Sequence, residues 1–247
     1  MNSVKLSIVV PTYNESDRIE RTLDDLTGFL SKKDFKWEII VSDDGSTDDT
    51  LCLIDSWVNS SQIFMNGEIR KLSLPHEGKG SAVKVGMLAA EGELRFMCDA
   101  DFAMSADQID DFLINMDQGY DIVLGSREIS GATRLNEPLI RHLMGRIFNF
   151  LVSLIAVKGF KDTQCGYKCF SAVSANTLFS AQKLTGWSFD VEILMLARKK
   201  YMKILEMPIL WHHRDKSKVS AISASVEMIR DTILTRIRYI TGDYSDF

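Results

Sequence analysis

Segments of two different hydrophobic periodicities alternate along the first 128 residues of the chain. Short apolar runs rich in valine and isoleucine are typical of buried strands, and between them apolar residues recur at helical spacing. The expected strands lie within residues 6–10, 37–42, 68–74, 93–101 and 120–127, and the expected helices within 17–30, 48–58, 78–92 and 106–117. This alternation predicts an α/β fold with a mostly parallel central sheet and helices on both faces.

The second half of the chain has more helical segments and an irregular middle, residues 158–170, which read KGFKDTQCGYKCF. Because no repeat, low-complexity segment or obvious linker interrupts the 247 residues, we expect a single domain, 1–247. Residues 1–128 would form its nucleotide-type α/β half, and 129–247 a helix-rich C-terminal extension. The formal net charge of −5 argues against nucleic acid as the main partner. The four cysteines lack a zinc-binding pattern, which favours buried reduced thiols.

Polar residues follow three of the expected strands. Asp43 and Asp44 come after the second strand, Asp99 and Asp101 end the fourth, and Arg127 follows the fifth. Sheets of this kind bind ligands at the carboxyl ends of their strands. We therefore expect these side chains to meet at one edge of the sheet and to form the functional site there.

Asp99 and Asp101 are separated by a single residue at the end of a hydrophobic strand. In an extended chain alternate side chains point to the same side, so the two carboxylates should form one hard oxygen site. Such a site suits Mg²⁺ or Mn²⁺, which takes its remaining ligands from water and substrate phosphates. The alternative, a helix cap and a turn aspartate, would leave Asp43 and Asp44 at the neighbouring strand end unexplained.

Four segments, VVPTYNE, VSDDGSTDDT, GKGSAVKVGM and CDADFA, resemble the family 2 glycosyltransferases with a GT-A fold. The resemblance covers nearly the whole chain and implies a nucleotide-sugar donor. It also implies that Asp99 and Asp101 hold a divalent metal against the donor diphosphate, with Asp101 as the main ligand. The implied donor-binding residues are Pro11, Tyr13, Glu15, Asp43, Asp44, Lys79, Asp99, Asp101 and Arg127.

The second half narrows this resemblance. VLGSR, DTQCGYKCF, WSFDVEIL and TRIRYITGDY are similar to segments of the dolichyl-phosphate β-glucosyltransferases. The related polyprenyl-phosphate mannosyltransferases usually carry a glutamine two residues after the second aspartate. Ala103 stands at that place here, which favours glucose and UDP. A GDP-mannose-dependent mannosyltransferase is the alternative function.

The resemblance implies an inverting, metal-assisted transfer of glucose from UDP-glucose to a polyprenyl phosphate. A phosphate monoester has a second pKa of about 6, so it is mostly a dianion near neutral pH and needs no strong general base. The enzyme must instead hold two anionic substrates together, which favours arginine and lysine. Arg127 is the expected catalytic cation. The expected acceptor-phosphate residues are Arg134, Arg214, Ser217 and Lys218; for Arg134, a solvated surface charge is an equal alternative.

Other acceptor-side residues are expected around residue 163 and at the start of a helix near residue 189. Asp190 is predicted to orient a glucose hydroxyl or Lys218, although an acid there also favours the helix dipole. By the resemblance, Asp162, Gln164 and Trp187 shape the acceptor loop, with a purely structural role as the alternative. An enzyme that used a sugar hydroxyl as acceptor would need Asp190 as its base. A binding protein without activity is disfavoured because the acidic and basic site residues are all present.

No apolar run approaches the ~20 residues of a membrane span, and no signal peptide is evident. Two stretches, 141–159 and 226–240, combine apolar and basic residues. In the second, Ile229, Ile233, Ile237 and Ile240 lie on one helical stripe with arginines nearby. We therefore expect a cytoplasmic protein that is peripheral to a membrane face. Core-facing helices or a homo-oligomer interface are the alternatives.

Overall fold

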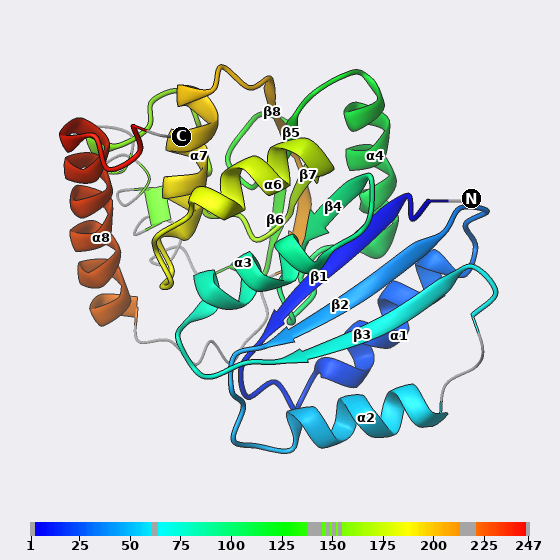
Figure 1. The fold of residues 1–247 in the computed structure, drawn as a ribbon. Helices are drawn as coiled ribbons and strands as arrows, with labels where there is room; N and C mark the ends of the chain where they lie inside the picture. The colour runs from blue at the N-terminus through cyan, green and yellow to red at the C-terminus, as the bar shows by residue number, and fades with distance from the viewer. Residues whose placement is uncertain are drawn as a thin grey trace.

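The computed structural model describes residues 3–60, 64–137, 145–146, 149, 152, 155–212 and 221–245. Within these residues a seven-stranded sheet lies between two layers of helices (Figure 1). Its strands are β1 (Leu6–Thr12), β2 (Trp37–Asp43), β3 (Gly67–Ser73), β4 (Leu94–Met97), β5 (Ile122–Ser126), β7 (Lys168–Ser171) and β8 (Ile204–Pro208). The helices are α1 (Ile19–Leu30), α2 (Thr50–Ser60), α3 (Lys79–Ala89), α4 (Ile109–Asp117), α6 (Ala172–Ala181), α7 (Phe189–Lys199) and α8 (Ala221–Thr241).

The sheet has the order β3-β2-β1-β4-β7-β5-β8. Neighbouring strands are parallel except at β7, which is antiparallel to both β4 and β5. The predicted α/β architecture and the strands and helices expected in the first 128 residues are therefore confirmed. The expectation of an irregular middle is wrong at its end, because Lys168–Phe170 lies inside β7. The second half of the chain thus contributes a central strand between two strands of the first half.

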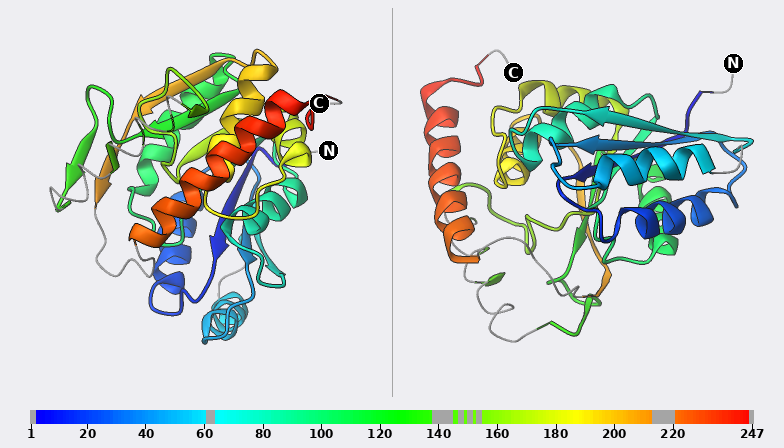
Figure 2. Two further views of the ribbon diagram at one scale, coloured as in Figure 1. Left: turned by 90° about the vertical axis from the view of Figure 1, so that its left-hand side faces the viewer. Right: turned by 90° about the horizontal axis from the view of Figure 1, so that it is seen from below.

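The strands between the two edge strands β3 and β8 are buried on both faces, and their side chains alternate between two hydrophobic cores. Leu6, Ile8 and Val10 of β1 face one core, and Val9 faces the other. The first core is closed by α1, α2 and α4, and the second by α3, α6 and α7. The two views of Figure 2 show the same separation of helices, with α8 standing outside α7.

Helix α8 reverses the usual burial pattern of an outer helix. Asp231, Thr232 and Thr235 are buried on it, while Ile233 and Ile237 are exposed. The two threonines donate hydrogen bonds to carbonyl oxygens one turn earlier in the same helix, so their burial leaves no hydroxyl unsatisfied. The core-facing alternative is therefore wrong for Ile233, Ile237 and Ile240, which are exposed. Ile229, the first residue of the stripe, is partly buried against the second core.

Among the described residues, no helix has both the length and the apolar character needed to cross a membrane. Cys98, Cys165 and Cys169 are buried and unpaired, as expected, whereas Cys52 is exposed. A small second sheet pairs β6 (Thr133–Leu135) with β9 (Leu210–His212), and the 3₁₀ helix η1 (Ala106–Gln108) precedes α4. These short elements border the loop that follows β4, because the backbone N–H of His212 donates to the carbonyl of Ala103.

Candidate active site

The two aspartates of the Asp-x-Asp segment lie in a turn, not in an extended strand. β4 ends at Met97, and the backbone N–H of Phe102 donates to the carbonyl of Asp99 at 3.1 Å. Phe102 has a φ of 38°, a left-handed conformation that is uncommon for a bulky residue. The premise that alternation in an extended chain aligns the carboxylates is therefore wrong. The turn still brings Asp99 and Asp101 close enough to repel each other.

Lys79, the first residue of α3, lies against this turn. Its Nζ is 2.5 Å from Oδ1 of Asp99. Burial alone would raise the pKa of Asp99, but the charge and hydrogen bond of Lys79 outweigh burial and hold that pKa below its ordinary value. The sequence places Lys79 here because the glycine turn before α3 packs against the backbone of Thr185 and Gly186.

Asp101 has the opposite electrostatic environment. Burial, and next the charge of Asp99, raise the pKa of Asp101 above its ordinary value, although Lys79 acts against them. A cation beside Asp101 would remove this repulsion. Among the described residues, no cluster of three or more metal-binding side chains is present. Two carboxylates nevertheless fit Mg²⁺ or Mn²⁺, because such ions complete their shell with water and substrate phosphates.

Asp43 and Asp44 hold the turns at the ends of β1, β2 and β3. Asp43 accepts hydrogen bonds from the hydroxyl of Thr12 at 3.0 Å and from both the backbone and the hydroxyl of Ser46. Asp44 accepts from the backbone N–H groups of Glu77 and Gly78, immediately before α3. Both carboxylates are buried at the edge of the sheet where the sequence predicts a nucleoside pocket. These hydrogen bonds hold Ser46 at the end of β2, and they hold Glu77 and Gly78 at the start of α3.

Aromatic rings lie beside Asp44. The ring of Tyr13 stacks on that of His76, with centroids 4.2 Å apart, and Nδ1 of His76 is 2.7 Å from Oδ2 of Asp44. Pro11 is buried within β1, and Glu15 pairs with Arg18 at 2.8 Å. Tyr13 therefore lies beside Asp44 through His76, whereas Pro11 is held within the strand and Glu15 against Arg18.

Arg127 follows β5 and forms a two-point ion pair with Asp162. Nε and Nη2 of Arg127 donate to the two carboxylate oxygens at 2.7 and 2.9 Å, and the Arg127 backbone N–H donates to the same group. Burial would raise the pKa of Asp162, but Arg127 outweighs it and lowers the pKa to about 2. Asp162 therefore orients Arg127 and is itself fully buried.

Arg134 does not fit the predicted phosphate site. Its guanidinium contacts the carboxylates of Glu128 and Glu137, and its Nε donates to the carbonyl of Arg127. Two acids thus neutralise this charge within its own loop. The other predicted phosphate residues, Arg214, Ser217 and Lys218, lie outside the described residues.

Asp190 is buried at the start of α7 and pairs with a residue that the sequence reading did not single out. Nζ of Lys168 is 2.7 Å from Oδ1 of Asp190. Despite this partner, burial keeps the pKa of Asp190 above its ordinary value. Gly166 was also missed: a Cβ atom there would lie 2.1 Å from Oδ2 of Asp99. Both residues stand in the segment CGYKCF, whose lysine inside an apolar strand was the available signal.

The remaining acceptor-side residues line the approach to this cluster. Trp187 is 40 % exposed, and Nζ of Lys79 lies 5.2 Å from the centroid of its ring. The Gln164 amide is 3.0 Å from the sulfur of Met228 on α8, and the Ser188 hydroxyl donates to the Met228 carbonyl. The site is therefore bounded by α3, the loop before α7 and α8.

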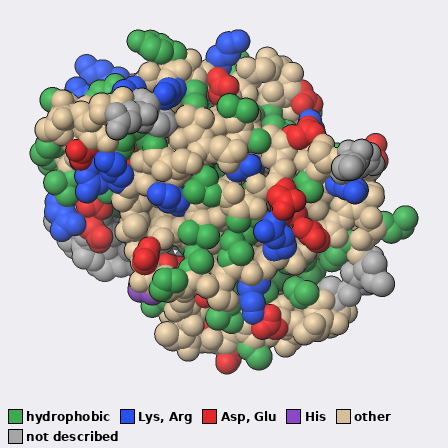
Figure 3. All heavy atoms as spheres, in the orientation of Figure 1, with side chains coloured by type: hydrophobic (Ala, Val, Ile, Leu, Met, Phe, Trp, Pro, Cys, Tyr) green, Lys and Arg blue, Asp and Glu red, His purple; other side chains and the backbone are tan. Residues whose placement is uncertain are grey.

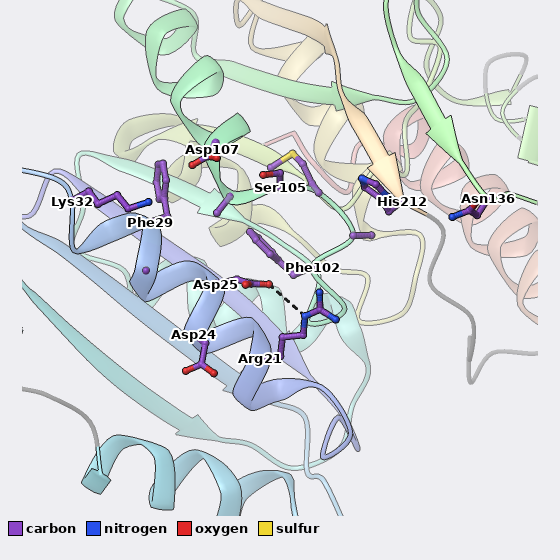
Figure 4. Close-up of a pocket in the computed structure, with 14 residues that line it drawn as sticks. Arg21, Asp24, Asp25, Phe29, Lys32, Phe102, Ser105, Asp107, Asn136 and His212 are labelled. Carbon is purple, nitrogen blue, oxygen red and sulfur yellow. Dashed lines mark ion pairs between the residues drawn. The ribbon is translucent and has the colours of Figure 1, made fainter.

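A pocket of about 780 Å³ lies on α1 beside the same turn (Figure 4). Phe102 and Ala103 are among its lining residues, whereas Asp99 and Asp101 are not. Its rim carries charges of both signs, including Arg21 at 3.8 Å from Asp25. This mixed rim has no preference for an anionic substrate. Phe102 and Ala103 belong both to the wall of the pocket and to the segment around the turn. The pocket therefore lies next to the turn that carries Asp99 and Asp101.

The chain as a whole matches a known group of enzymes. The family described as glycosyl transferase family 2 matches residues 7–179. The chain belongs to this family. The dolichyl-phosphate β-glucosyltransferase of Dictyostelium discoideum is 37 % identical over 98 % of this chain and 77 % of its own length. The human enzyme of the same name is 31 % identical over 96 % of this chain and 76 % of its own length.

Solved structures agree with the family 2 assignment at the level of the fold. Glucosyl-3-phosphoglycerate synthase from Mycobacterium tuberculosis, with Mn²⁺, UDP and its product, has a TM-score of 0.70 at 18 % identity. The same enzyme with Mn²⁺, UDP-glucose and phosphoglyceric acid has a TM-score of 0.66 at 18 % identity. Both matches cover 94 % of this chain, and they cover 80 % and 79 % of the respective solved chains. The expected GT-A-type fold is thereby confirmed.

Gly166→Ala should inactivate this glycosyl transferase without unfolding it. The new methyl group would displace the Asp99 carboxylate and break its contact with Lys79, and a displacement of about 1 Å can cost about 100-fold in rate. Nucleotide-sugar turnover measures the loss. Gly28→Ala on α1 is the matched control, because no atom lies within 4 Å of its Cβ position. Equal turnover in both variants would contradict the close approach.

Asp162→Asn should destabilise the fold at neutral pH by up to about 3 kcal/mol, the low end for a buried pair, because it leaves the mostly buried Arg127 charge without its partner. The wild-type pair contributes stability above the ordinary aspartate pKa of 3.8 and loses it as the pH falls towards about 2. Urea unfolding at several pH values should therefore show the two proteins converging in acid. The control is Asp110→Asn, which breaks the half-exposed pair with Lys33 and should cost less than about 1 kcal/mol. A pH-independent difference would argue against the pair.

Proposed function

We propose that this chain transfers glucose from UDP-glucose to a polyprenyl phosphate of the dolichyl type, with inversion at the anomeric carbon. The observation that carries the proposal is the pairing of Asp99 and Asp101 opposite Lys79 in a chain similar over almost its full length to dolichyl-phosphate β-glucosyltransferases. The Mn²⁺ and UDP-glucose of the mycobacterial enzyme are consistent with the donor side of the proposal. Residues 1–128 would bind the donor, and 129–247 the acceptor and the membrane.

On the donor side, each described residue has a physical task. Asp101, with Asp99 beside it, would hold Mg²⁺ or Mn²⁺, which when bound supplies positive charge against the leaving diphosphate. Lys79 can exchange its contact with Asp99 for a phosphate oxygen. Tyr13 offers a ring face to the base, and the turns held by Asp43 and Asp44 shape the nucleoside pocket.

The acceptor side needs cations more than it needs a base. A phosphate dianion is already a nucleophile at neutral pH, so the transfer does not depend on proton removal by a carboxylate. The proposal therefore assigns Asp190, which is held in a buried ion pair with Lys168, to orienting groups on the acceptor side and does not use it as a base. Arg127 would face the phosphates from its fixed position on Asp162. Arg214, Ser217 and Lys218 stay in the proposed acceptor site, and Arg134 is left out of it.

The donor and acceptor are tested with purified protein, a panel of nucleotide sugars and a short polyprenyl phosphate, with Mg²⁺ or Mn²⁺ present. UDP-glucose should yield a glucosylated lipid phosphate, and GDP-mannose should not. Asp101→Asn should lower this turnover by at least about 100-fold, since even residues behind a metal ligand are worth 10–100-fold. Asp107→Asn, on the exposed stretch after the turn, should retain full turnover. Wild-type rates in Asp101→Asn would refute the metal site, and a mannosylated product would refute the donor.

The lipid tail of the acceptor requires contact with a membrane, and α8 offers a suitable surface. Ile233, Leu234, Ile237 and Ile240 are exposed on α8, and its arginines Arg230 and Arg236 are exposed beside them. Figure 3 shows hydrophobic and basic side chains together along the left edge of the molecule, where Figure 1 places α8. We include in the proposal that α8 rests on the headgroup region of the cytoplasmic membrane face. About half of the other basic and apolar stretch, residues 141–159, lies outside the described residues.

Replacing Ile237 and Ile240 with glutamate should release the protein from vesicles that contain anionic lipid. Each buried isoleucine contributes roughly 1.5–3 kcal/mol, so the double variant should bind at least about tenfold more weakly. Co-sedimentation at low salt measures the binding. Ile114→Glu is the matched control, since Ile114 is 59 % exposed but lies on α4, on the other side of the sheet. Membrane docking by α8 would be refuted by a double variant that sediments like the wild type.

A further inference from the structure

Lys168 places a positive charge inside the molecule, on an interior strand of the sheet. Its side chain is 1 % exposed, and lysine is almost never buried to this degree without a partner. β7, which carries it, is the antiparallel strand between β4 and β5. The donor and acceptor residues discussed above do not account for this charge.

The contacts of Lys168 fix its ammonium group from two directions. Its Nζ donates to the carbonyl of Cys165 and lies 2.7 Å from Oδ1 of Asp190. Asp190 stands in the first turn of α7, so this ion pair joins the sheet to the helix that borders the acceptor side. Lys168 also attracts Asp99 and Asp162 at longer range.

Two lysines and two aspartates therefore form one cluster of alternating charge, in which the Lys168–Asp190 pair is buried and the Lys79–Asp99 pair is partly exposed. Lys79 contacts Asp99, and Lys168 contacts Asp190. Across the cluster, Lys79 also attracts Asp190, while Asp99 repels it. Without Lys168, the cation that acts on Asp190 would be Lys79. Asp190 and Asp99 would then compete for the same ammonium group.

We propose that Lys168 is a positioning residue, whose ion pair holds Asp190 on the acceptor side and leaves Lys79 available to the donor diphosphate. The terms donor and acceptor rest on the proposed function. A purely structural role explains the cluster less well, because buried ion pairs can often be replaced by apolar residues without loss of stability. With two neighbouring ion pairs, each lysine has its own acid: Lys79 contacts Asp99, and Lys168 contacts Asp190.

Lys168→Met tests the proposal, because methionine keeps the length of the side chain and removes its charge. Lys79 should move towards Asp190, so the affinity for UDP with Mn²⁺, measured by calorimetry, should fall about tenfold or more, the worth of one charge-assisted hydrogen bond. Adding Asp190→Asn to Lys168→Met removes the competitor and should restore UDP affinity to the wild-type level. Glucosyl transfer should stay low in the double variant, as in Asp190→Asn alone.

A crystal structure of Lys168→Met gives a readout that needs no enzymatic activity. It should show Nζ of Lys79 displaced from Asp99 towards Asp190. Lys79 retained on Asp99, or UDP affinity not restored in the double variant, would overturn the proposal. If Lys168→Met does not fold, Lys168→Arg keeps the charge but moves its donors. That variant should lower kcat with unchanged UDP affinity, and a loss of affinity there would also overturn it.

Arg70→Met is the matched control for the loss of a buried ion pair elsewhere in the sheet. Arg70 on β3 contacts the buried Glu38 at 2.9 Å, away from the four-charge cluster. This variant should lower the unfolding midpoint in urea and leave UDP affinity unchanged. The experiments also separate this inference from the proposed function. If the wild-type protein binds UDP but does not glucosylate the lipid, the proposed function is refuted. The effect of Lys168→Met on UDP affinity can still be measured in that case.

Discussion

The repulsion between Asp99 and Asp101 is the constraint on which the arrangement of the rest of the site depends. A tight turn directly after β4 holds the two carboxylates close together. Lys79 lowers the pKa of Asp99, whereas the pKa of Asp101 stays above its ordinary value. Asp101 is therefore the carboxylate that a further cation would stabilise more. The site is thus prepared electrostatically for a cation before any substrate arrives, and little reorganisation is needed when one binds.

The antiparallel strand β7 makes this arrangement possible. Because it enters the sheet between β4 and β5, the residues just before it lie directly beside the Asp99 turn, and Gly166 leaves room for the carboxylate. The same strand carries Lys168 to the start of α7. The charges proposed for the donor and for the acceptor therefore lie in one cluster, to which residues on both sides of position 128 contribute.

Periodicity was sufficient to predict β1 to β5, α1 to α4 and the edge where the acids gather, because these depend on local hydrophobic patterns. It could not predict β7, because Lys168 interrupts the apolar pattern of this strand and its partners β4 and β5 are distant in sequence. Resemblance identified Asp99 and Asp101, but the turn that joins them, the Asp162 partner of Arg127 and the neutralisation of Arg134 depend on long-range contacts. Lys168 and Gly166 were overlooked because neither is unusual until the neighbouring acid is placed.

Helix α8 touches the acceptor loop with one face and leaves its isoleucines outside. The carbonyl of Met228 accepts the Ser188 hydroxyl, and the Met228 sulfur accepts the Gln164 amide. The helix has 21 residues, which corresponds to a rod about 31 Å long. Under the proposed docking, the face of α8 that enters the lipid would set the distance between the reacting phosphate and the bilayer surface.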